Sequence, residues 1–530
     1  MLAFFYEPIS EEECYEEKDG KEKLNHKLHG SSKGFKIFEL ICLIIIIFLF
    51  LTLKWATSNF GNINMDNTLF TGTTPGEGAD PEFVIKFLLE AFLPSAFLFG
   101  FFLFDILRKK KHTLGLKCST QKNIKSFQLY PIRDNKIVFF AVLVLGVVGV
   151  GIDAEKNIGI FSYFANYVTK STIFEEEFVE PNDVTLTFPK EKKNLIYILM
   201  ESGEASNQNK ENGGIFDDNY TPEMTQIAKD NISFSQNDLI VGAEPAPATG
   251  WTMAGMVSQF SGIPLKFNFD AYLIHPMENF LPGVTTLGEI LEKEGYKNYY
   301  MIGSDAKFGA RDKFMIQHGN YEILDYNRAI EDGQIPEDYK VWWGFEDSKL
   351  YEYAKKTITE ISKNDEPFNF TMLTVDTHNP DGFICPLCED EFDEQYANVW
   401  ACSSRQLNEF INWIKEQPFY ENTTIVISGD HCSMAPRFYK GNDGKRTVYN
   451  AIVHPFAEPV NEKNRKFTTL DFFPTTLRAM GVDIEGDRLG MGTNLFSARE
   501  TLSEELGYKK YFGELAKKSE FYNKNILMVK

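Results

Sequence analysis

The sequence is poor in positive charge for its length. Its 530 residues include 54 Lys and Arg against 75 Asp and Glu, which gives a formal net charge of -21 at pH 7. A nucleic-acid-binding protein needs a basic face, so this balance argues against nucleic acid as a partner. The sequence also shows no internal repeat and no low-complexity stretch. With 43% hydrophobic and 24% charged residues it is neither disordered nor collagenous.

Long apolar runs are confined to the first 152 residues. Phe35 to Leu53 is apolar except for Lys36 and Glu39, and at about 1.5 Å per residue it approaches the thickness of a bilayer. A second run covers 83–107, and a shorter third one covers 137–152. The pattern predicts a membrane part of about three helices within residues 35–152. The alternative is that one run is a buried hairpin of a soluble protein.

The distribution of Lys and Arg predicts the orientation of these helices. Residues 108–136 contain nine Lys or Arg and the single acid Asp134, whereas residues 54–81 contain only Lys54 as a basic residue. Because basic loops stay in the cytoplasm, residues 108–136 and the N-terminal tail are expected inside. Three spans then place everything after Asp153 outside the cytoplasm. If the third span were absent, the large domain would be cytoplasmic.

The chain contains seven cysteines. Four of them lie after the membrane part: Cys385, Cys388, Cys402 and Cys432. In an oxidising compartment some of them are expected to form a disulfide, and the pair we favour is Cys388 with Cys402. The CPLC segment is also a possible zinc site. No second such pair and no pair of histidines accompanies it, so zinc is the weaker interpretation.

From residue 193 onward, short apolar runs alternate with helical patterns, which is typical of an α/β domain with a central, mostly parallel sheet. We expect strands at 194–200, 298–303, 370–375 and 424–428. We expect helices at 285–294, 348–362 and 404–415.

Polar residues with metal-binding side chains follow three of these strands. Glu201 follows the first, Asp376 and His378 follow the third, and Asp430 and His431 follow the fourth. The carboxyl ends of parallel strands meet at one edge of a sheet, so these groups converge toward a site for a divalent cation. A single acidic residue at a strand end is a helix cap or loop anchor in about four cases out of five. Because three strands here are followed by such residues, a purely structural explanation is less favoured than it is for a single position.

The segment from Gly242 to Leu265 adds a possible nucleophile. A loop rich in Pro, Ala and Gly precedes a helical pattern, so Thr249 and Thr252 stand at or just before a helix N-terminus. Free N–H groups there favour phosphate, and a metal ion lowers the pKa of a neighbouring hydroxyl. From the residues alone, both threonines are at least as well explained as N-caps.

The segments NLIYILMES, ATGWTMAGM, LTVDTHNPDGF and IVISGDH occur in an order and spacing that resemble a known group. They are similar to membrane-anchored transferases of the alkaline phosphatase superfamily, and most similar to the phosphoglycerol transferase I-like and lipoteichoic acid synthase family. The resemblance covers roughly residues 190 to 500. It implies a sulfatase-like α/β fold behind an α-helical membrane part.

The resemblance also implies roles for individual residues. It makes Glu201, Asp430 and His431, together with the nucleophilic threonine, the ligands of one divalent metal ion, Mn or Zn rather than Mg. Counting back from Gly262 to Pro264 favours Thr249 as that nucleophile, with Thr252 as the second choice.

Two further residues of the resembling segments concern the substrate. His378 and Arg311 match residues that bind it. A Trp found near this Arg in the synthases is replaced here, since Gly309 stands at its position.

The implied function is transfer of the glycerophosphate headgroup of phosphatidylglycerol, through a phospho-threonine, to a periplasmic or surface glycan. Alternatives are a phosphoethanolamine transferase acting on lipid A or a surface glycan, a membrane-tethered phosphodiesterase or sulfatase, and an inactive binding protein. A sulfatase is disfavoured because no C-x-P-x-R or S-x-P-x-R sequence stands at the nucleophile.

The expected organisation is a multi-pass protein of the cytoplasmic membrane with a periplasmic or extracytoplasmic catalytic domain. Its parts are a cytoplasmic tail (1–34), a transmembrane region (35–152), a connector (153–190), the catalytic domain (191–500) and a C-terminal extension (501–530).

Overall fold

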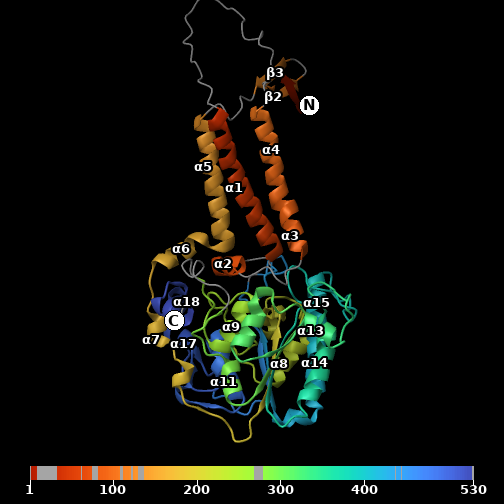
Figure 1. Cartoon of the computed structure of the whole chain (residues 1–530), viewed down its shortest axis with the longest axis vertical. Helices are drawn as coiled ribbons and strands as arrows, with labels where there is room; N and C mark the ends of the chain where they lie inside the picture. Colours follow the sequence, from red (N-terminus) through yellow and green to blue (C-terminus); the bar gives the residue numbers. More distant parts are fainter. Residues whose placement is uncertain are drawn as a thin grey trace, which may run out of the picture. The chain divides into compact units, whose positions relative to one another are not determined.

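The structure is a computed structural model that describes residues 2–8, 33–60, 63–73, 81–107, 112–120, 123–128, 136–267, 279–435, 437–442 and 444–527. Two compact units make up the chain (Figure 1). The first combines Met1–Ser58 with Pro81–Asn157, and the second combines Asn59–Asp80 with Ile158–Lys530.

The first unit is built from apolar helices. These are α1 (Lys33–Phe60), α3 (Pro81–Phe87), the π-helical turn η2 (Leu88–Phe92), α4 (Leu93–Leu107) and α5 (Lys136–Ile158). Lys54 of α1 forms an ion pair with Asp153 of α5 at 3.1 Å, and the Trp55 ring lies 5.0 Å from that of Phe87. Within the described residues, Gly34–Phe60 and Val84–Phe104 are long and apolar enough to cross a membrane.

The third expected span lies in α5, which is helical over its whole length but is not one of those two segments. Acidic residues at 153 and 155 and the lysine at 156 shorten its apolar stretch. Part of the basic segment 108–136 forms strands β2 (His112–Thr120) and β3 (Asn123–Gln128), which extend β1 (Leu2–Pro8) into an antiparallel sheet. The number of spans and their orientation stay predictions.

The second unit contains a six-stranded sheet in the order β10-β9-β5-β8-β6-β7. Every neighbouring pair is parallel except β10 with β9, which is antiparallel. The strands are β5 (Asn194–Met200), β6 (Lys297–Ile302), β7 (Glu322–Leu324), β8 (Phe368–Leu373), β9 (Thr423–Gly429) and β10 (Asn450–Val453). The four expected strands are therefore present, and the α/β fold class is confirmed. Strands β7 and β10, which lie at the two sheet edges, were not predicted from the sequence.

The sheet is buried on both faces, which explains why its strands are continuous apolar runs rather than alternating ones. In β5 the side chains of Leu195, Tyr197 and Leu199 enter one core. Their neighbours Ile196, Ile198 and Met200 enter the other. Helices from both sides complete these two cores (Figure 1).

One core receives α9 (Thr252–Ser261), α11 (Leu287–Lys293), α12 (Arg311–Gln317) and α16 (Phe472–Ala479). The other receives α8 (Pro222–Asp230), α13 (Tyr326–Glu331), α14 (Asp347–Ile361) and α15 (Gln395–Lys415). The expected helices correspond to α11, α14 and α15. Helix α15 begins nine residues before the expected 404, because its first turns carry buried residues such as Trp400 that a short amphipathic pattern does not reveal.

Residues expected to be a connector contribute to the domain core. This segment contains α6 (Ile160–Val168), α7 (Ile173–Glu177) and β4 (Leu186–Thr187), which pairs with β11 (Asp483–Ile484). Phe174 of α7 is fully buried against Tyr522, with the ring centroids 5.1 Å apart. The C-terminal segment, with α17 (Leu502–Leu506) and α18 (Tyr508–Ala516), is buried in the same core through Tyr511 and Leu515. The predicted connector and the predicted C-terminal extension are therefore packed parts of the second unit.

Candidate active site

Three predicted metal ligands meet where β5 and β9 end. One ligand atom each from Glu201, Asp430 and His431 lies within 4.8 Å of the other two. His431 Nε2 is 3.7 Å from Glu201 Oε1 and 3.4 Å from Asp430 Oδ2. Because β5 and β9 are parallel neighbours, with Met200 paired to Gly429, the residues that follow them are brought side by side.

The backbone after β5 and β9 aims these side chains at one another. Ser202 adopts a left-handed conformation, with φ of 57°, so that its N–H donates to Asp430 Oδ1 at 2.7 Å. The His431 N–H donates to the same oxygen at 2.8 Å. His431 Nδ1 lies 2.8 Å from the Cys432 carbonyl, and donation to that carbonyl leaves Nε2 with its lone pair toward the cluster.

The cluster has the donor atoms and the charge that a cation requires. Asp430 Oδ2 and His431 Nε2 are buried, and neither has a hydrogen-bond partner in the described part of the chain. Burial and the neighbouring Glu201 carboxylate raise the pKa of Asp430 to about 8. Two buried carboxylates this close repel each other unless a positive charge lies between them. The residues present therefore fit one divalent metal ion.

The two threonines have different surroundings. Thr249 is buried, and its hydroxyl donates to the Ala246 carbonyl at 2.8 Å. Thr252 is the first residue of α9, and its hydroxyl lies 3.4 Å from Glu201 Oε2. Thr252 also lines a cavity with Glu201, whereas Thr249 does not line it. The geometry favours Thr252, the second choice of the sequence analysis, because the hydroxyl of Thr249 is held by its own loop.

Helix α9 is anchored directly to the loop that carries Asp430. Gln259 donates from Nε2 to the Gly429 carbonyl at 2.8 Å, and it accepts from the Tyr197 hydroxyl at 2.8 Å. A Cβ at Gly255 would lie 2.1 Å from the Asp430 carbonyl oxygen, so only glycine permits this approach. This contact fixes the N-terminus of α9, with its free N–H groups, beside the metal-ligand cluster.

Arg311 and His378 line the same cavity as Thr252. Arg311 Nη2 lies 3.3 Å from the Ser304 hydroxyl and 3.2 Å from the Asp305 carbonyl, while its buried Nε has no partner among the described residues. His378 Nδ1 lies 2.8 Å from the Asn379 carbonyl. Burial lowers the pKa of His378 below its usual value, against the opposing effect of Glu201. A neutral imidazole and a guanidinium therefore face the threonine hydroxyl across one small cavity.

Two aromatic residues of this cavity, Trp343 and Phe308, were not predicted from the sequence. The Trp343 ring lies 4.9 Å from the His378 ring and 5.4 Å from the Phe308 ring. Gly344 brings it there, because a Cβ at Gly344 would lie 2.0 Å from the carbonyl oxygen of Gly303, directly after β6. An indole is thus present even though Gly309 replaces the expected Trp. The adjacent Trp pair in VWWGF was the available signal, but it follows no expected strand.

Asp376 and the four cysteines of this domain do not line this cavity. Asp376 is buried near the end of β8, and its carboxylate oxygens have no hydrogen-bond partner among the described residues. Cys385, Cys388, Cys402 and Cys432 are free thiols, so the expected Cys388–Cys402 disulfide is not formed in the structure. His454 follows β10, which runs antiparallel to β9, so it lies at the opposite end of the sheet from Asp430.

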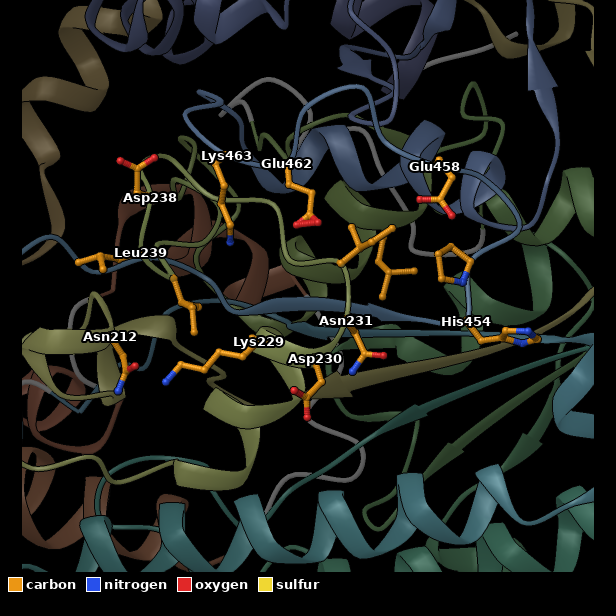
Figure 2. Close-up of a pocket in the computed structure, with 15 residues that line it drawn as sticks. Asn212, Lys229, Asp230, Asn231, Asp238, Leu239, His454, Glu458, Glu462 and Lys463 are labelled. Carbon is orange, nitrogen blue, oxygen red and sulfur yellow. The ribbon is translucent and has the colours of Figure 1, made fainter.

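His454 lines a different cavity of about 600 Å³, shown in Figure 2. Figure 2 shows Lys229 and Asp230 on one side and Glu462 and Lys463 on the other. His454 Nδ1 lies 3.1 Å from the Tyr420 carbonyl and 3.0 Å from the Thr423 carbonyl. Charges of both signs line this cavity, without the convergence of unpartnered ligands found at the other end.

Comparison with known proteins identifies the family of this chain. The sulfatase family model matches residues 193–482. Phosphoglycerol transferase I of Escherichia coli O6:K15:H31 (strain 536 / UPEC) is 32% identical over 325 residues, which are 60% of this chain and 41% of that protein. The same enzyme from Shigella boydii serotype 18 (strain CDC 3083-94 / BS512) is also 32% identical, with the same coverage. The chain thus spans about two-fifths of the length of these curated relatives.

Two solved structures show partial similarity to this chain. The lipoteichoic acid synthase LtaP from Listeria monocytogenes has a TM-score of 0.46 at 18% identity, covering 62% of this chain and 82% of that one. The integral membrane lipooligosaccharide phosphoethanolamine transferase A from Neisseria meningitidis has a TM-score of 0.47 at 11% identity, covering 84% of each chain.

Proposed function

The chain belongs to the sulfatase family, and we propose that it is a membrane-anchored phosphoglycerol transferase that uses phosphatidylglycerol as donor and an extracytoplasmic glycan as acceptor. The observation that carries the proposal is the position of Thr252. Its hydroxyl lies at the N-terminus of α9, 3.4 Å from Glu201, in a cavity that also contains Arg311 and His378. This is an arrangement for attack on a phosphodiester rather than for binding alone.

In the proposed site Glu201, Asp430 and His431, together with the Thr252 hydroxyl, would hold one divalent ion. Two carboxylates, an imidazole and a hydroxyl suit Mn or Zn better than Mg. When bound, such an ion supplies Lewis acidity that makes a hydroxyl more acidic and offsets charge on phosphate oxygens. Asp430 and Glu201 keep their orientation through the Ser202 N–H and hydroxyl, which bond to one oxygen of each carboxylate at 2.7 Å and 2.8 Å.

The first half of the reaction forms a bond between Thr252 Oγ1 and phosphorus and breaks the bond from phosphorus to the diacylglycerol oxygen. The proton lost by Thr252 passes to the departing diacylglycerol. Arg311 and the first N–H groups of α9 bind the phosphate oxygens, and they stabilise the charge that develops during attack. A glycerophosphoryl ester of Thr252 remains.

The second half reverses this exchange with a glycan hydroxyl in place of diacylglycerol. His378 accepts the hydroxyl proton at Nε2, because its Nδ1 donates to the Asn379 carbonyl. The acceptor oxygen bonds to phosphorus, Thr252 Oγ1 departs, and the proton held by His378 restores the threonine hydroxyl. The Trp343 and Phe308 rings bound the cavity and exclude water, which would otherwise release free glycerophosphate.

A membrane anchor suits this chemistry, since the donor is a lipid. The apolar segments Gly34–Phe60 and Val84–Phe104 supply helices of the required length. Anchoring raises the effective concentration of the active site near lipid headgroups. We therefore include in the proposal a location in the cytoplasmic membrane, with the catalytic domain on its outer side.

The test is mass analysis of the full-length protein in detergent, given Mn or Zn and either phosphatidylglycerol or phosphatidylethanolamine, without an acceptor. We expect a glycerophosphoryl adduct with phosphatidylglycerol, located on Thr252 by peptide fragmentation. An ethanolamine phosphate adduct would identify the phosphoethanolamine transferase instead. Release of headgroup phosphate without any adduct would identify a hydrolase.

Two matched variants locate the nucleophile. Thr252→Ala is expected to abolish the adduct while leaving the metal content unchanged, whereas Thr249→Ala is expected to retain the adduct. The opposite pair of results would return the role to Thr249.

A further inference from the structure

Three cysteine side chains converge outside the phosphate site. Cys388 Sγ lies 3.6 Å from Cys385 Sγ, and Cys385 Sγ lies 3.8 Å from Cys402 Sγ. All three sulfur atoms lie within 4.8 Å of one another. Cys385 and Cys402 are buried and Cys388 is half-buried.

Two separate segments supply these thiols. Cys385 and Cys388 belong to the loop after His378 and are joined by a turn in which the Cys388 N–H donates to the Cys385 carbonyl at 3.0 Å. Cys402 lies in α15. One turn further along α15, Gln406 Nε2 lies 3.3 Å from Cys402 Sγ and 3.7 Å from Cys385 Sγ.

The separations between the sulfur atoms match a tetrahedral metal site. A zinc–sulfur bond of about 2.3 Å in tetrahedral geometry places neighbouring sulfur atoms about 3.8 Å apart. A disulfide requires about 2.05 Å, so any pair here would have to move closer by more than an ångström. The third thiol would then be left over, whereas a metal ion uses all three.

We propose that Cys385, Cys388 and Cys402 bind a soft divalent cation, zinc, as three thiolates. The Gln406 amide supplies hydrogen bonds to two of the sulfurs, as groups around thiolate ligands commonly do. One of the four tetrahedral positions is left for a ligand such as water. Zinc binding displaces the thiol protons to solvent, so no oxidant or reductant is involved.

The site would hold the loop of His378 against α15. The Phe383 N–H donates to the Asp376 carbonyl at 2.8 Å, and the Glu391 N–H donates to Asn398 Oδ1 of α15 at 2.9 Å. Cys385 and Cys388 lie between these two attachments along the chain, and Cys402 lies one turn beyond Asn398 in α15. Zinc here would therefore stabilise the loop without touching the phosphate.

The test measures zinc in the full-length protein, purified in detergent after loading with zinc alone and removal of excess. We expect two equivalents per chain in the wild type and one in Cys402→Ser. Asp430→Asn is expected to keep the thiolate zinc and lose the other one, which separates this proposal from the proposed function. Cys42→Ser, which removes a thiol of α1, is the matched control and is expected to keep both. An unchanged zinc content in Cys402→Ser would overturn the proposal.

A second measurement uses the wild type and does not depend on how a variant folds. Stepwise titration with a mercurial reagent is expected to release one zinc as three thiols react. After denaturation and chelation, without reductant, iodoacetamide is expected to alkylate all three cysteines. If two of them react only after reduction, they form a disulfide and the proposal is wrong.

Discussion

The two ends of the central sheet differ in how their polar groups are paired. At the carboxyl ends of β5, β8 and β9, buried atoms of Asp430 and His431 have no hydrogen-bond partner within the described residues, and Glu201 of the same cluster lines a small cavity. At the opposite end a cavity of about 600 Å³ is lined by charges of both signs, and the His454 ring is bonded to backbone carbonyls. The comparison teaches that the volume of a cavity does not identify chemistry, whereas convergent unpartnered ligands do.

Asp430→Asn tests the difference between the two ends of the sheet with the largest expected effect. The amide oxygen can still accept the N–H groups of Ser202 and His431, but the site loses one carboxylate charge. We expect transfer from labelled phosphatidylglycerol to fall on the order of a thousand-fold or more, because the cation and its charge stabilisation are lost. Zinc content should fall by one equivalent. Transfer at the wild-type rate would refute the metal assignment.

A smaller loss is expected for Arg311→Lys. Lysine keeps the positive charge but loses the planar fork and the buried Nε, so phosphate oxygens are bound with poorer geometry. We expect kcat/KM to fall about a hundred-fold, with the metal content unchanged. Lys307→Ala, an exposed cation of the same loop, is the matched control and should lose little. If Arg311→Lys lost as little as Lys307→Ala, the positive charge at position 311 would be sufficient and the guanidinium geometry would not be required.

Glu504→Gln should affect stability and not catalysis. Arg465 donates to both Glu504 oxygens, at 2.8 Å and 3.1 Å, and a glutamine can keep the capping box with Thr501. Removing the charge from this largely buried pair should lower the melting temperature at pH 7 by on the order of 5 °C. Transfer below the melting transition should stay within about two-fold of wild type.

The same variant has a pH dependence of known sign. Burial raises the pKa of Glu504, but the bonds from Arg465 and from the backbone outweigh burial and hold that pKa below its usual value. The charged pair therefore stabilises the fold above the unfolded-state pKa, and this contribution is lost as the pH falls through the lower, folded-state pKa. The difference in melting temperature between wild type and Glu504→Gln should shrink at acid pH. A difference that grows on acidification would contradict this.

The smallest effect is expected for His454→Ala. Its ring lies at the opposite end of the sheet from Asp430, where it contacts backbone carbonyls and the Tyr420 ring, whose centroid is 4.8 Å away. Transfer should stay within about three-fold of wild type, and the melting temperature should change by a few degrees at most. A loss approaching that of Asp430→Asn would remove the distinction between the two ends.

Much of the fold follows from local pattern. A strand buried on both faces needs a continuous apolar run, so β5, β6, β8 and β9 were predicted within two residues at each end. Strands β7 and β10 have only three and four residues, too few for a pattern to distinguish them from loop. Segments 153–190 and 501–530 carry isolated apolar residues whose burial depends on distant partners, as the contact of Phe174 with Tyr522 shows.

The sequence by itself determined which residues follow the strands, and therefore that Glu201, Asp430 and His431 come to one edge. Parallel pairing brings the ends of neighbouring strands together whatever the rest of the chain does. Only the tertiary structure distinguished Thr252 from Thr249, brought Trp343 to His378, and placed Cys385 together with the predicted pair Cys388 and Cys402 as three free thiols. Each of these depends on contacts between segments far apart in the chain, which spacing along the sequence does not encode.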